Sequence, residues 1–411
     1  MSPTKLWHIR DYVFLLSAQS ASTLVGAGMN VIFPLLILKF TGSLAAAGVV
    51  GVLRSAPYLF LSLPLGALVD RWNRRHIMIA CQIGRSICFF GLGLMAHYGA
   101  VDQWHIYFVC MVDGILFVFF NIAEAAALSS VVPRELLPQA SSTNEAGFGT
   151  AMILGPPAAT LIYEIWGIGG ALFAGAFCYF GSFLLLKILK TELNVSRLEA
   201  RCSLTVEIAE GVRWLAGARL ILLLACIMGG LNLINAAMPL LAITLGQRLG
   251  ASDTSIGTMV ACGGVGSVLG SMCGTRWLRL HGFGRGAMLA AWLHAVAVGA
   301  LFIATSLPML GLVYGLVVGF YSLYAVMQFA YRVRAVPEQL QGRVNSSCRL
   351  IAFSLYPLGS ALAGILSQYW GVQVALTLFT AVAVLLACTL SLSRSIAPAW
   401  REGAVQKGLR K

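Results

Sequence analysis

The sequence has 411 residues, of which 59% are hydrophobic and only 10% are charged. A soluble domain has about 25% charged residues, so a soluble protein of this composition would lack the polar side chains to cover its surface. The formal net charge of +13 does not indicate nucleic-acid binding, because the basic residues stand in short clusters between apolar segments. The composition therefore predicts an integral membrane protein.

Apolar segments recur along the chain at lengths that suit a membrane helix. Since about 20 apolar residues cross a bilayer, a chain of this length accommodates about twelve spans. We expect them at approximately 12–38, 44–66, 76–96, 104–130, 141–163, 168–189, 219–244, 254–275, 286–305, 308–331, 345–367 and 372–393. The first is longer than a signal-peptide core and has no small-residue cleavage site, so we expect it to be retained.

Basic residues alternate between loops. The loop after the second span contains Arg71, Arg74 and Arg75, whereas the loops on the opposite side contain only Lys39 and Arg248. Because positive charge resists translocation, we expect both termini and the long middle loop to be cytoplasmic, in a multi-pass protein of a bacterial inner membrane.

The middle loop divides the chain into two halves. We expect a six-helix bundle in residues 1–189, a cytoplasmic linker in 190–218, and a second six-helix bundle with a short cytoplasmic tail in 219–411. Within the linker, Ile208, Val212 and Leu215 recur at helical spacing, which predicts an amphipathic helix.

The second half of the sequence repeats residues of the first half at a constant offset. An offset of 204 positions brings Val132-Pro133 onto Val336-Pro337, Gly155 onto Gly359, and Trp166-Gly167 onto Trp370-Gly371. An even number of spans in each half predicts parallel repeats related by an axis along the membrane normal. The expected fold is an all-α integral membrane protein whose twelve transmembrane helices form two pseudo-two-fold-related six-helix bundles around a site near mid-membrane.

The loop after the second span resembles a sequence motif of a known protein family. The segment from Gly66 through Asp70 and Arg71 to Asn73, Arg74 and Arg75 resembles the signature loop of the major facilitator superfamily, although the family usually has glycine where Asn73 stands. This resemblance implies that Asp70 meets a helix end and that the arginines hold a cytoplasmic gate. Asparagine also tolerates a left-handed turn, so this departure from the family pattern is mild.

Three further segments narrow the resemblance to one branch. Thr41-Gly42-Ser43, the segment 132–136 and Gly342-Arg343-Val344 are similar to the macrolide-efflux and enterobactin-exporter branch. Gly149 and Gly155-Pro156 in the fifth span are similar to an antiporter motif associated with exporters, which favours outward transport.

Ionisable residues inside spans are costly and are therefore functional candidates. Arg54 and Asp113 lie at similar depths, so we expect an ion pair that either carries protons or pins two helices together. Glu124 lies near the cytoplasmic end of the fourth span. The resemblance implies that it engages Arg71 or Arg74 at the gate, and we expect Arg85 to share that cluster.

Polar and aromatic residues in other spans are candidates for a substrate cavity. Tyr314, Tyr321 and Tyr324 share one helical face. The cavity set, which suits a bulky amphipathic organic molecule, is Asn30, Phe117, Asn232, Asn235, Tyr314, Tyr321, Tyr324 and Gln328. Packing between helices is the alternative for each residue.

The sequence lacks the motifs of several common catalytic and binding sites. The stretch 264–270 is similar to GxGxxG but has one residue more, and it lies in an apolar span with no preceding strand, so Gly266, Gly270 and Gly274 predict a close helix-packing seam. The sequence has no GxxxxGK[ST] motif, CxxC pair, catalytic triad or metal-ligand spacing. We expect no enzyme activity, no cofactor and no metal.

The leading interpretation is a proton-coupled secondary transporter that exports a drug-like compound or a siderophore-type metabolite. A transporter of lysophospholipids is an alternative, and a non-transporting membrane sensor or scaffold is an alternative of another class. The expected partners are a small organic substrate, protons and membrane lipid, with the protein acting as a monomer and binding no nucleic acid.

Overall fold

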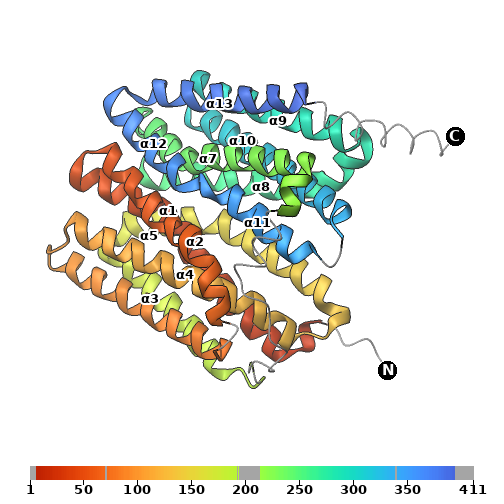
Figure 1. Cartoon of the computed structure of the whole chain (residues 1–411). Coiled ribbons are helices and arrows are strands. Elements are labelled where there is room, and N and C mark those ends of the chain that lie inside the picture. Colours follow the sequence, from red (N-terminus) through yellow and green to blue (C-terminus); the bar gives the residue numbers. More distant parts are fainter. Residues whose placement is uncertain (1–5, 70–71, 192, 194–212, 338–339, 394–411) are drawn as a thin grey trace. The chain divides into compact units, whose positions relative to one another are not determined.

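The computed structural model describes residues 6–69, 72–191, 193, 213–337 and 340–393, and these form helices without a strand (Figure 1). The α-helices are α1 (Arg10–Thr41), α2 (Leu44–Val69), α3 (Arg74–His97), α4 (Gln103–Val131), α5 (Leu137–Ile188), α7 (Arg219–Arg248), α8 (Asp253–His281), α9 (Phe283–Ala300), α10 (Leu307–Ala335), α11 (Gln341–Ser354), α12 (Tyr356–Tyr369) and α13 (Val372–Leu392). Short 3₁₀ helices occupy Leu6–His8, Arg134–Leu136 and Leu301–Ile303.

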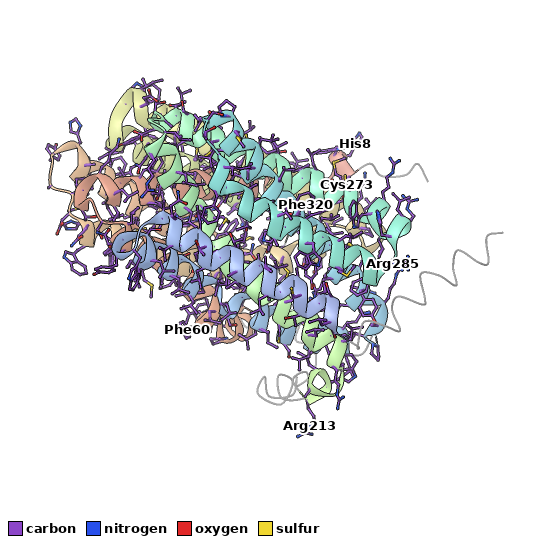
Figure 2. The ribbon with its side chains drawn as sticks, turned by 90° about the horizontal axis from the view of Figure 1, so that it is seen from above. His8, Phe60, Arg213, Cys273, Arg285 and Phe320 are labelled. Carbon is purple, nitrogen blue, oxygen red and sulfur yellow. The ribbon has the colours of Figure 1, made fainter. Side chains whose placement is uncertain are left out.

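Eleven helical segments of the described part are long and apolar enough to cross a membrane. Large apolar side chains lie on their outer surfaces: Phe60 is 71% exposed, Met272 72% and Phe108 65%. Figure 2 shows Phe60 at the edge of the drawn ribbon. Water would solvate such a surface poorly, whereas lipid chains match it. The prediction of an all-α membrane protein is confirmed.

Helix α5 contains two of the predicted spans. Its 52 residues would measure about 78 Å at 1.5 Å per residue, far more than a hydrocarbon core of about 30 Å. Gly167 interrupts it with φ 69° and ψ −169°, a conformation open to glycine alone. The predicted fifth and sixth spans lie on either side of this break.

The predicted span 345–367 is divided between α11 and α12 at Leu355. Pro357 follows directly, at the first turn of α12. Proline has no N–H to donate and its ring crowds the carbonyl four residues earlier, which favours a break here, although α1 and α5 continue through Pro34 and Pro156. The predicted span coincides with the apolar segment Val344–Tyr369, and the structure adds that this segment is divided into two helices.

The repeat found in the sequence recurs in local geometry. Gly371, 204 positions after Gly167, also has positive φ, with φ 86° and ψ 157°, and separates α12 from α13. Val132 and Val336 both stand at helix C-caps in extended conformations, with φ −112° and −96°. Each pair therefore ends or breaks a helix at the same place in its half.

Glycines also bring equivalent helices together. A Cβ atom placed on Gly155 would lie 2.6 Å from the carbonyl oxygen of Leu24 on α1. One placed on Gly359 would collide with the carbonyl oxygen of Leu233 on α7. In both halves, the absence of a side chain allows two backbones to touch.

The glycine seam predicted in α8 is confirmed. A Cβ atom placed on Gly266 would meet the carbonyl of Gly315, and one placed on Gly270 would meet the carbonyl of Gly319. A Cβ atom placed on Gly274 would lie 2.7 Å from Cγ1 of Val326. The seam holds α8 against α10 by backbone contact rather than by binding a nucleotide.

The chain forms two compact units, which we call unit 1 (residues 1–200 and 252–261) and unit 2 (201–251 and 262–411). In unit 1, α1 packs on α5, α3 packs on α4 and α5, and α2 packs on α4 (Figure 1). In unit 2, α7 packs on α12, while α9 packs on α10 and α13. Most of the predicted linker, 192 and 194–212, lies outside the described residues, so its amphipathic helix stays a prediction.

Candidate functional site

A cluster of charged side chains lies inside unit 1, where α1 to α4 meet. Nη2 of Arg54 on α2 lies 3.3 Å from Oδ2 of Asp113 on α4. Nε of Arg85 on α3 lies 2.7 Å from Oδ1 of the same carboxylate. The structure thus contains the expected Arg54–Asp113 ion pair and adds a second guanidinium that we expected elsewhere.

The prediction that Arg85 belongs to the cytoplasmic gate with Glu124 is wrong. Arg85 stands eleven residues into α3, about 16 Å along the helix, which is near mid-membrane. Its side chain is 1% exposed, and its Nη1 donates to Oγ of Ser22 at 2.7 Å. Its Cζ lies 4.2 Å from the ring centroid of Tyr179, a cation–π contact that helps compensate burial. Counting residues from the start of α3 could have revealed this depth.

The two arginines have unequal surroundings. Arg85 is enclosed, whereas the side chain of Arg54 is 14% exposed. Nη2 of Arg54 also donates to the carbonyl oxygen of Gly26 at 3.3 Å, and its Cζ lies 5.4 Å from the ring centroid of Phe33. Arg85 is therefore a fixed partner of Asp113, and Arg54 is the partner with an open side.

Glu124 is buried in a different setting. It is 4% exposed, and its Oε1 accepts a hydrogen bond from Nδ2 of Asn144 at 3.1 Å. Oδ1 of Asn144 in turn accepts from the hydroxyl of Tyr12 at 3.2 Å. None of the three ion pairs found among the described residues includes Glu124.

The expected gate contact between Glu124 and Arg74 is not formed. Nη1 of Arg74 instead donates to the carbonyl oxygen of Ala126 at 3.4 Å and to Oγ of Ser130 at 3.2 Å. The alternative partner, Arg71, lies outside the described residues together with Asp70, and the surroundings of Gly66 are likewise not described.

Asn73 and Arg75 anchor the start of α3. Oδ1 of Asn73 accepts from the backbone N–H groups of Arg75 at 2.9 Å and His76 at 3.4 Å. Asn73 has φ −65° and ψ 115°, so it does not adopt a left-handed conformation and serves instead as an N-cap. Arg75 donates to the carbonyl oxygens of Leu186, at 3.2 Å, and Lys187 at the end of α5, where a cation is favourable.

The antiporter-like segment forms a tight contact between α5 and α1. Gly155 and Pro156 are buried, and Gly149 lies six residues earlier in α5. Oγ1 of Thr160 donates to the carbonyl oxygen of Pro156 at 2.9 Å. This segment therefore fixes how α5 approaches α1.

The cavity candidates fall into two groups. In unit 1, Asn30 and Phe117 are exposed, with Phe117 at 37%. In unit 2, Asn232 is buried and its Oδ1 accepts from the hydroxyl of Tyr321 at 2.8 Å. Asn235 is half-buried, while Tyr314, Tyr324 and Gln328 are buried. Their part in a substrate cavity stays a prediction.

Membrane-spanning helices, a repeated helix-breaking glycine and a charge cluster within the spans define a polytopic membrane protein of two similar halves, an architecture common among secondary transporters. A model of the Major Facilitator Superfamily matches residues 15–246 and 220–410. The chain therefore belongs to the major facilitator superfamily, and it is a transporter rather than an enzyme.

Curated relatives and solved structures agree with this membership. The chain is 26% identical over 371 residues to the multidrug efflux pump Tap of Mycolicibacterium fortuitum, covering 85% of this chain and 87% of that protein. It is 24% identical over 160 residues to macrolide efflux protein A of Streptococcus pyogenes, covering 39% of each.

Two solved transporters show the same fold at low sequence identity. The nucleoside transporter NupG has a TM-score of 0.76 at 13% identity, covering 93% of this chain and 99% of that chain. A bacterial homologue of the human lysosomal transporter Spinster has a TM-score of 0.74 at 14% identity, covering 97% and 99%.

Proposed function

We propose that this protein exports a small organic molecule across the bacterial inner membrane in exchange for protons, by alternating access. Two relatives bear the names of efflux pumps for multiple drugs and for macrolides. The Gly155-Pro156 contact resembles an exporter motif, which favours outward direction. In this proposal the protein acts as a monomer, with both termini in the cytoplasm, on a drug-like or siderophore-type substrate.

The observation that carries the proton coupling is the pair of buried acids in unit 1. Asp113 and Glu124 are 2% and 4% exposed within membrane helices, where a carboxylate is costly. Their surroundings differ, because Asp113 has two guanidinium partners and Glu124 has an amide. A buried carboxylate without a neighbouring cation is stabilised more by protonation than one that is paired with arginines, because protonation removes its uncompensated charge.

We assign different roles to Glu124 and Asp113 because their surroundings differ. Glu124 binds and releases the transported proton, and its contact with Asn144 links α4 to α5. Asp113 holds Arg54 and Arg85 in one protonation state and releases the more open Arg54 when it takes up a proton. Both events would change how the helices of unit 1 are held together.

Inverted membrane vesicles test the proposal directly. Vesicles with an acidic lumen should accumulate at least one compound from a panel of drug-like cations and anions, siderophores and lysophospholipids, and dissipating the gradient should abolish the accumulation. Glu124→Gln and Asp113→Asn should each reduce gradient-driven uptake by at least tenfold. Glu135→Gln, which changes an exposed acid, serves as the matched control.

The outcomes separate the parts of the proposal. Unchanged coupled uptake in both Glu124→Gln and Asp113→Asn would contradict proton coupling through these acids. A wild-type protein that moves no compound of this panel under any gradient would contradict export itself.

A further inference from the structure

The charge cluster of unit 1 carries more positive than negative charge. Arg54 and Arg85 both contact Asp113, and each of its two oxygens already faces one guanidinium. Among the described residues, no other ion pair involves either arginine. One positive charge therefore remains uncompensated inside the membrane segment, where it strongly favours an incoming anion.

The unused hydrogen-bonding capacity lies on Arg54. Its Nη1 atom is buried and has no hydrogen-bond partner in the described part of the chain. The other arginine differs, because its Nε and Nη1 atoms bind Asp113 and Ser22. Since a buried donor without a partner is unfavourable, Nη1 of Arg54 is the place where an added acceptor gains most.

The neighbours of Arg54 form one side of a binding site. Gly26 and Phe33, which contact Arg54, lie on the same face of α1 as Asn30, since the three are spaced by four and three residues. Asn30 is exposed and offers amide donors beside the guanidinium.

An aromatic ring stands on the opposite helix. Phe117 follows Asp113 by one helical turn on α4, and its ring centroid lies 5.9 Å from Cζ of Arg85. It is 37% exposed, which leaves much of its surface available to an apolar body. Guanidinium, amide and ring together match a molecule with an acidic group attached to an apolar part.

We propose that Arg54 binds the carboxylate or phosphate of an organic anion, with Asn30 and Phe117 contacting the rest of the molecule. The inference rests on the proposed export for its biological role, because it names the substrate class of that transporter. Binding itself can be measured without transport.

Matched fluorescent probes on the purified full-length protein provide the test. Dansylglycine carries a carboxylate, and dansylglycinamide has the same body without the charge. The wild type should bind the acid at least about tenfold more tightly than the amide, in line with one charge-assisted contact. Arg54→Gln should bring the two within about twofold, whereas Arg54→Lys should retain part of the preference.

Two further variants keep the result interpretable. Asp113→Asn removes the internal anion and should strengthen the preference for the acid, the opposite sign to Arg54→Gln. Arg248→Gln, at an exposed arginine at the end of α7, should leave the preference unchanged. Size-exclusion profiles establish that each variant is folded, and if Arg54→Gln fails to fold, the sign of the Asp113→Asn effect decides.

Equal binding of acid and amide by the wild type, or a preference unaltered in Arg54→Gln, would overturn the inference. A weaker preference for the acid in Asp113→Asn would also overturn it. Displacement of dansylglycine by lysophosphatidylglycerol would support a lipid source of the anion, and displacement by benzoate alone would support a soluble one. Failure of gradient-driven uptake in vesicles would instead count against export and leave the binding result intact.

Discussion

Units 1 and 2 share a scaffold and differ in what they bury. Gly155 and Gly359 make equivalent backbone contacts, and Gly167 and Gly371 make equivalent helix breaks. Yet unit 1 buries one arginine, Arg85, and two carboxylates, Asp113 and Glu124, whereas the buried polar side chains described in unit 2 are uncharged amides, hydroxyls and one histidine. His294, for example, is fully buried with Nδ1 3.0 Å from the carbonyl oxygen of Val317. Helix packing is therefore specified by the glycines that both units share, whereas charge placement is specified by residues found in unit 1.

The largest expected effect concerns the charge cluster. Arg85→Gln removes the fully buried partner of Asp113 and should lower the free energy of unfolding by roughly 3–5 kcal/mol, because the carboxylate loses compensation. Thermal unfolding in detergent measures this loss. The double variant Arg85→Gln/Asp113→Asn should recover part of it, and a loss below about 1 kcal/mol in the single variant would contradict the assigned pairing.

The backbone contacts test whether the scaffolds are equivalent. Gly155→Val and Gly359→Val should each destabilise their unit by about 1–3 kcal/mol or more, since the added atoms meet a carbonyl oxygen. Gly26→Ala is the matched control, because nothing lies within 4 Å of the new methyl group. A large loss of stability from the substitution in one unit and none in the other would show that the two backbone contacts are not equivalent.

Substitutions at the two helix-breaking glycines should lower stability by similar amounts, and by less than the substitutions at the backbone contacts. Gly167→Ala and Gly371→Ala force a side chain into positive φ and should cost about 1–2 kcal/mol each. Thermal unfolding of the two variants, with Gly91→Ala as a control in open space, measures the difference. A stabilising effect at either position would show that the turn there can be rebuilt.

The smallest effect belongs to the uncharged interior of unit 2. Tyr321→Phe removes the hydrogen bond to Asn232 and should cost about 0.5–1.5 kcal/mol. Proton-driven uptake in inverted vesicles should keep its pH dependence, unlike that of Glu124→Gln. A pH dependence altered as much as in Glu124→Gln would place coupling in both units and remove the distinction between them.

Much of the fold could be predicted from the sequence because its signals are local. Spans such as 219–244 and 372–393 coincide with α7 and α13 to within a few residues. The Trp-Gly pairs marked both helix breaks, since positive φ is a property of glycine itself. The predicted span 345–367 coincides with Val344–Tyr369, but its division at Leu355 could not be predicted, since α1 and α5 continue through their own prolines.

The site was less predictable because it depends on partners from different helices. Arg54 and Asp113 could be paired from their depths, but Arg85 was assigned to the wrong acid. Asn73 resembled a substitute for glycine, and only its hydrogen bonds to Arg75 and His76 revealed an N-cap. In each case the side chain's direction decided the role.

The sequence by itself determined that this is a multi-span membrane protein of two repeated halves, because lipid requires long apolar helices and the repeat preserves the residues that end them. The tertiary structure decided which charges meet. Helix rotation and depth place Arg85 on Asp113 and leave Glu124 with Asn144. Such contacts arise from packing among α1 to α5, and a buried charge takes its properties from the groups that packing brings within a few ångströms.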